Sequence, residues 1–277
     1  MRLARLGITP PSTWHPALYK MAVWRKQLAR SVAWRFDGHD YVRGPGAAPL
    51  QHLVYRHTSK LIRVAPGVDP ALQQGKVLNL DVAMPLIDGA VIEPGQTLSF
   101  CRLVGPPTRE RGFALGMELA QGRPRAGVGG GLCALANMLH WLTLHSPLCV
   151  VERHHHSVDP FPDDGRVLPF GSGATVFYNY LDYRVSNRTS TAFQFRLCRD
   201  ERQLIGELRA ERLPELAYHV FERDAAFERT SDKTFRRNSI WRTIVDRRTG
   251  RTLTEERLYL NRGEVLYPLP SGYTGSR

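Results

Sequence analysis

Apolar residues are densest in one stretch near the middle of the chain, between a run of glycines and a run of histidines. Residues 132–145 contain no Gly or Pro and are apolar almost all round, which predicts a buried helix too short to span a bilayer. Cys133, Asn137 and His140 are polar exceptions whose spacing places them on one face. Residues 146–151 (SPLCVV) then predict a helix end followed by a short buried strand.

Two further helices are predicted before this stretch. Residues 15–32 place apolar side chains at three- and four-residue steps, which predicts an amphipathic helix that covers part of the core or lies on an anionic membrane. Its other face is basic and carries Lys20, Arg25, Lys26 and Arg30. Asp69 as the cap and Pro70 in the first turn predict a helix that runs toward residues 82–85, although Gly75 weakens it.

The remaining apolar segments are short and separated by turn residues. Strands are expected at 50–55, 61–64, 98–100, 113–120, 148–153, 174–185, 192–197, 204–209, 217–221, 239–245 and 252–260, and tight turns on either side of residues 91–92. The last two form a predicted hairpin across residues 246–251, which contain Thr-Gly. Because most strands follow one another at hairpin spacing, the pattern predicts an α+β fold: an antiparallel, β-rich core around one buried central helix, with a basic amphipathic helix at the N-terminus.

We divide the chain into three predicted regions. Residues 1–66 hold the basic helix and lead-in strands, residues 67–210 hold the core with the glycine run and central helix, and residues 211–277 hold C-terminal antiparallel strands and a tail.

Composition adds a strong positive charge to this picture. The 277 residues include 38 Lys and Arg, mostly arginine, against 26 Asp and Glu, which gives a formal net charge of +12. Such a charge favours an anionic partner, or it reflects arginine-rich codon usage alone. The arginines are dispersed and no aromatic-rich RNA-binding motif occurs, so we do not expect nucleic-acid binding.

The cysteines and the N-terminus bear on the compartment. The four cysteines lie far apart with no CxxC pair, which argues against a zinc ribbon and a dense disulfide framework. The opening segment MRLARLGITPPSTW lacks the continuous apolar core of a signal peptide. We therefore expect a cytoplasmic protein, peripheral to the inner face of the membrane if the helix at 15–32 binds lipid.

A thiol and an imidazole flank the central helix and the strand that follows it. Cys133 lies in the first turn of the helix, where the dipole and free amides favour a thiolate. His156 would act as the base and Asp182 would orient its ring, which predicts a hydrolase or acyltransferase for an amide or ester. In the alternative reading, Cys133 is a small apolar residue of a packed helix and His156 is structural or exposed.

The same junction also predicts a non-catalytic anion site. The glycines and the helix amides would hold a phosphate or carboxylate, with arginines lining the pocket. The predicted binding residues are Gly129, Gly130, Gly131, Asn137, Glu152, Arg153 and Arg102, with Arg125 as a further lining candidate. In the alternative, these residues have only a structural role: the glycines allow tight packing, and Glu152 and Arg153 form a local ion pair.

The histidine run raises a third alternative, a zinc-binding module. His154 and His156 would project to one side of an extended segment, with Cys133, Glu152 or Asp159 completing the ligands. Adjacent histidines without a second spaced pair favour a polar loop, so we assign no metal ligand and expect no cofactor.

Several short motifs resemble the VanW family in its short form. The most specific pairing is Gly-Gly-Gly-Leu-Cys at 129–133 with Glu-Arg-x-x-His at 152–156. Further matching segments are 95–100 (GQTLSF), 102–104 (RLV), 181–182 (LD), 185–189 (VSNRT) and 259–270, so the resemblance covers nearly the whole chain.

The resemblance implies an accessory role in cell-envelope or glycopeptide-resistance physiology, and it makes a peptidoglycan precursor the natural anionic ligand. Two positions depart from the family pattern. Ala134 stands where the family usually has Gln, and Gly173 stands where it has Asp. If that Gln and Asp take part in a reaction, this chain lacks two of its parts.

Overall fold

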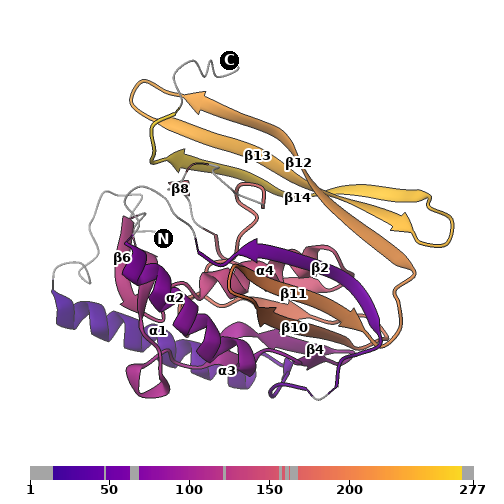
Figure 1. Cartoon of the computed structure of the whole chain (residues 1–277), viewed down its shortest axis with the longest axis horizontal. Coiled ribbons are helices and arrows are strands. Elements are labelled where there is room, and N and C mark those ends of the chain that lie inside the picture. The colour runs from indigo at the N-terminus through magenta and orange to yellow at the C-terminus, as the bar shows by residue number, and fades with distance from the viewer. Residues whose placement is uncertain are drawn as a thin grey trace.

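The computed structural model describes residues 15–46, 48–62, 69–120, 123–155, 158–159, 162 and 168–269. Within these ranges the chain has the predicted α+β fold (Figure 1), with mostly antiparallel sheets and few helices. The helical segments are α1 (Pro16–Phe36), α2 (Pro70–Ala83), η3 (Met84–Leu86), α3 (Phe100–Val104), η4 (Arg109–Arg111) and α4 (Cys133–Leu144).

Three four-stranded sheets and one two-stranded ribbon make up the described strands. The first sheet, which we call sheet A, has the order β1 (Asp40–Tyr41), β4 (Gln96–Ser99), β9 (Arg184–Ser186) and β7 (Cys149–Glu152). Sheet B has the order β2 (His52–Lys60), β11 (Gln203–Ala210), β10 (Phe193–Arg199) and β3 (Val91–Ile92). The ribbon pairs β5 (Leu115–Ala120) with β6 (Arg123–Val128).

The third sheet, sheet D, is built from the long C-terminal strands. Its order is β12 (Leu216–Arg229), β13 (Thr234–Asp246), β14 (Thr252–Val265) and β8 (Val158–Asp159). The predicted hairpin between β13 and β14 is confirmed, and the Asp246 carboxylate accepts from Thr249 N at 2.8 Å to close its turn. In Figure 1 this sheet lies along the side of the molecule opposite α1.

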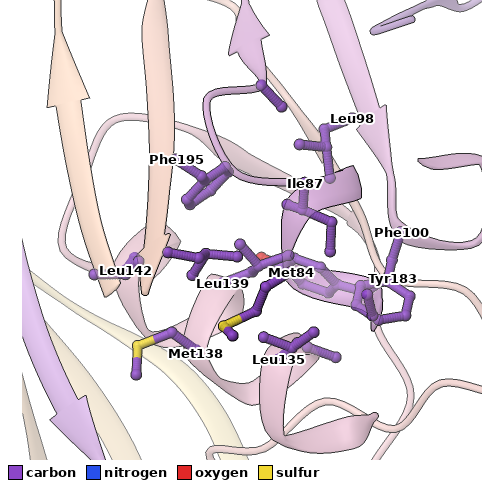
Figure 2. Packing of buried hydrophobic residues seen from close by; sticks show 14 of the residues in the cluster. Met84, Ile87, Leu98, Phe100, Leu135, Met138, Leu139, Leu142, Tyr183 and Phe195 are labelled. Atoms are coloured by element: carbon purple, nitrogen blue, oxygen red, sulfur yellow. The ribbon is translucent and has the colours of Figure 1, made fainter. Parts of the chain in front are cut away.

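The predicted central helix, α4, is buried as expected. Its side chains Leu135, Leu139 and Leu142 are fully buried and pack with residues of sheets A and B in one hydrophobic core (Figure 2). Sheet B lies directly against the helix, because a Cβ atom on Gly206 of β11 would be 2.6 Å from the Met138 sulfur. Core packing of this kind, rather than helix propensity, keeps a short helix folded.

Two strand predictions are wrong in detail. The strand expected at 50–55 is shifted and lengthened into β2, which ends at Lys60. Of the strand expected at 61–64, residues 61–62 belong to no strand, and residues 63–64 lie outside the described residues. The expected strand at 174–185 is mostly a turn closed by a Phe177–Leu181 bridge, and only its end enters β9. Asn179 takes a left-handed φ of 52° in that turn, a conformation that asparagine tolerates better than most residues.

The predicted N-terminal helix is present as α1, but its orientation reverses the usual one. Its apolar face points to solvent, and its inner face is held by polar side chains. Among the helices that the structure describes, none combines the length and apolar character needed to cross a membrane.

Candidate functional site

Cys133 opens α4, as predicted, but its surroundings disfavour a thiolate. The Sγ atom donates to the Val176 carbonyl at 3.8 Å. Burial raises the pKa of the thiol, and the nearby Glu118 carboxylate raises it further. Since only a thiolate is strongly nucleophilic, Cys133 here resembles a packed, protonated thiol.

The Asp182 carboxylate accepts hydrogen bonds from residues at the start of α3. It is fully buried; Ser99 Oγ donates to one carboxylate oxygen at 2.5 Å and the Cys101 amide to the other at 2.9 Å. Burial raises the pKa of Asp182 despite these bonds. His156 lies outside the described residues, so the predicted pairing of His156 with Cys133 and Asp182 stays a prediction.

Graded thiol labelling tests whether Cys133 is activated. Cys198 is exposed on β10, whereas Cys133 is half-buried with a raised pKa. With N-ethylmaleimide near neutral pH we expect Cys198 to react at least about tenfold faster than Cys133, read by peptide mass spectrometry. The unfolded chain, in which both thiols react alike, is the control. A Cys133 that reacts as fast as Cys198 would contradict the buried-thiol account.

The glycine run is packed tightly against other segments. A Cβ atom on Gly130 would overlap the backbone of Gly116 in β5, and one on Gly131 would overlap the Lys76 side chain. Asn79 of α2 ties this junction together, because its Nδ2 donates to the Gly130 carbonyl at 2.8 Å. The geometry therefore gives these glycines a packing role, and anion binding by the turn stays a prediction.

Glu152 lies at the centre of an ion-pair network beneath α1. Arg30 of α1 donates to both of its carboxylate oxygens at 2.6 Å, and Arg184 Nε lies 3.0 Å from Oε2. Burial alone would raise the pKa of Glu152, but the bonds from Arg30 and His154 hold it below its usual value. Glu152 is paired across the structure rather than with its neighbour Arg153.

His154, a candidate ligand in the zinc alternative, is paired with Glu152 instead of with a second metal-binding side chain among the described residues. The ring of His154 lies 2.9 Å from Glu152 Oε1, and Arg30 occupies the same carboxylate. Within the described part of the chain, no three His, Cys, Asp or Glu side chains are arranged to hold a metal ion.

Arg153 and Asn137 hold the loop that follows residue 168. Arg153 donates to the carbonyls of Gly171 and Gly173, and its guanidinium lies 4.1 Å from the Tyr259 ring centroid. Asn137 Oδ1 accepts from the Ala174 amide at 2.6 Å. A Cβ atom on Gly173 would be 2.8 Å from that oxygen, which explains locally why glycine suits this position. Arg153 and Asn137, both predicted to bind an anion, here form hydrogen bonds that hold this loop in place.

Arg102, by contrast, reaches a surface pocket. The pocket has a volume of about 330 Å³ and is lined by Val42, Arg43, Gly44, Pro45, Leu86, Arg102 and Leu103. The guanidinium of Arg102 lies 4.4 Å from the Tyr41 ring centroid and 5.3 Å from that of Trp34. Arg43 was not predicted as a binding residue, because the residues around it form no motif. We call this hollow the arginine pocket.

Charge distinguishes the arginine pocket from a second hollow. The described lining of the arginine pocket contains no Asp or Glu, and no described carboxylate is ion-paired with Arg43 or Arg102. The other hollow, of about 340 Å³ on sheet B, also contains arginines. There Arg196 pairs with Asp88 and Arg209 with Glu207, both at 2.9 Å. Unpaired guanidinium groups are the better anion receptors.

Arg125, the remaining lining candidate, lies apart from this pocket on β6. Its Nε is 2.5 Å from Glu118 Oε1, so the structure pairs it with a carboxylate.

Comparison with known proteins identifies relatives along most of the chain. The family model described as "VanW like protein" matches residues 75–209. The Vancomycin B-type resistance protein VanW of Enterococcus faecalis is 30% identical over 255 residues, covering 92% of this chain and 93% of that protein. The uncharacterized protein YoaR of Bacillus subtilis is 31% identical over 111 residues, covering 40% of this chain and 35% of that protein. No solved structure matches.

Proposed function

Because the chain belongs to the VanW family, we propose that it acts in cell-envelope physiology by binding an anionic peptidoglycan precursor, with the arginine pocket as the site. The relative in Enterococcus faecalis is named a vancomycin B-type resistance protein, which supports an envelope role. One observation carries the choice of site: two arginines that have no carboxylate partner among the described residues line one pocket of ligand-binding size.

The chemistry of the pocket fits a diphosphate or carboxylate joined to a less polar group. A guanidinium offers a planar fork of N–H donors to two oxygens of one phosphate or carboxylate. Packing on Tyr41 and Trp34 holds Arg102 in place before a ligand binds, which lowers the entropy cost of binding. Val42, Leu86 and Leu103 supply an apolar wall for the rest of the ligand.

Binding of a UDP-linked muramyl pentapeptide, followed by calorimetry, tests the proposal. Replacing Arg43 by Ala should weaken binding about tenfold or more, because charge-assisted hydrogen bonds each contribute about 1.5–3 kcal/mol. Arg248→Ala, at an exposed arginine in the β13–β14 turn, is the matched control and should bind like the parent protein. Equal affinity in the Arg43 and Arg248 variants, or no binding by any of them, would refute the proposed site.

A further inference from the structure

The outward face of α1 carries large apolar side chains along its whole length. Trp24 and Phe36 are 62% and 79% exposed. The full set, which we call the outer stripe, lies three or four residues apart on one face of the helix: Leu18, Met21, Trp24, Leu28, Val32 and Phe36. A surface helix normally turns such a stripe toward the core, so this orientation requires a cause.

Polar contacts on the opposite face fix the helix in this orientation. Arg30 binds Glu152 through two bonds of 2.6 Å, and Lys26 lies 3.6 Å from the Tyr180 ring centroid. Asn179 Nδ2 donates to Ser31 Oγ at 3.3 Å. Turning the outer stripe inward would break these bonds and leave the Glu152 carboxylate with one fewer arginine partner. These contacts therefore keep the outer stripe facing solvent.

The charge around the stripe selects the partner. Residues 16–36 contain no Asp or Glu but carry Lys20, Arg25 and Arg35 on exposed positions. Arg25 and Arg35 lie among the apolar side chains on the outward side. An apolar stripe interspersed with cations matches a bilayer surface with acyl chains beneath anionic headgroups. Figure 1 shows α1 along one edge of the molecule, away from sheet D, so a flat surface can approach it.

We propose that α1 docks the protein on an anionic lipid bilayer, with the outer stripe inserted at the headgroup boundary and the Arg30–Glu152 contact holding the helix against the body of the protein. The arginine pocket plays no part in this inference. Docking through α1 can therefore hold even if precursor binding fails, and the reverse is also true.

Vesicle co-sedimentation of the full chain tests the docking. Binding is expected to vesicles containing about a third phosphatidylglycerol and not to pure phosphatidylcholine, and it should weaken as salt is raised. The double variant W24S/F36S should lower the partition coefficient at least about tenfold, since it removes two large apolar groups from the stripe. R25Q/R35Q should weaken binding to the anionic vesicles alone.

The matched control is L253S/L260S, which changes two exposed apolar residues of β14 and should leave binding unchanged. All variants should keep the parent protein's melting temperature, because the altered side chains are exposed. Undiminished vesicle binding by W24S/F36S would overturn the proposal. So would a parent dimer that W24S/F36S converts to monomer without any vesicle binding, since a second copy would then cover the stripe.

Discussion

The protein should lose about 3 kcal/mol or more of unfolding free energy between about pH 7 and about pH 4, and His145 supplies the largest defined part. Burial lowers its pKa to about 4. Below an ordinary histidine pKa of 6.5, the unfolded chain takes up a proton that folded His145 refuses. Stability is therefore complete above pH about 6.5 and falls as pH drops toward the folded pKa.

The surroundings of His145 explain this resistance to protonation. Its ring is buried and stacks on Tyr55 with centroids 3.7 Å apart. This burial outweighs the 2.9 Å bond that Nδ1 donates to the Trp141 carbonyl, which by itself raises the pKa. The nearby charges, from His57, His219 and Arg242, would all repel an imidazolium. His140 adds to the effect, since burial also holds its pKa well below the usual value. Asp182, whose pKa is raised, opposes it.

Urea unfolding at several pH values measures the effect. His140→Phe should flatten the pH dependence without a large loss of stability near neutral pH, because both ring nitrogens of His140 are buried without a hydrogen-bond partner among the described residues. His145→Phe should also flatten it while keeping the ring stack. A parent stability that stays constant down to about pH 4.5 would contradict these assignments.

The second large effect is expected from Gly130→Ala, which should destabilise the fold by about 3 kcal/mol. The added Cβ would overlap the backbone of Gly116, and neither backbone segment moves as easily as a flexible side chain. Separating them would also strain the Asn79 bond to the Gly130 carbonyl. Gly44→Ala is the matched control, because its Cβ would meet no atom of the described residues within 4 Å, and it should change stability by less than about 0.5 kcal/mol.

The free energies come from urea unfolding at neutral pH. Similar values for the Gly130 and Gly44 variants would mean that the glycine run is not a packing junction, and the anion-binding reading of that run would regain support.

Composition and capping residues predicted two helices correctly. The central helix follows from its apolar composition, and α2 begins as predicted where the Asp69 side chain accepts from the Ala71 amide at 2.8 Å. The strand prediction for residues 174–185 was wrong because the alternation of apolar and polar residues there is typical of a strand, whereas the turn at Asn179 depends on tertiary packing. Gly75 marks the close approach of the Leu115 carbonyl to α2, a long-range contact that no local pattern encodes.

The candidate site was predictable only in part, for a related reason. Residue types indicated that Arg102 can bind an anion, but its partners Tyr41 and Trp34 come from β1 and α1, far away in sequence. Likewise, Glu152 suggested a pair with its neighbour Arg153, while the fold supplies Arg30 and Arg184. The basic face of α1 was visible in the sequence. That one of its residues, Arg30, turns inward while Lys20 and Arg25 stay exposed depends on Glu152, which lies more than a hundred residues away.

Hydrogen exchange of the full chain, with and without the UDP-linked muramyl pentapeptide, tests the proposed binding site most directly. We expect slower exchange on ligand binding at residues 42–44 and 102–103, which line the arginine pocket. Residues 129–133 should exchange at the same rate in both states. Protection of the glycine run with none at the arginine pocket would contradict the account and place the ligand beside Cys133.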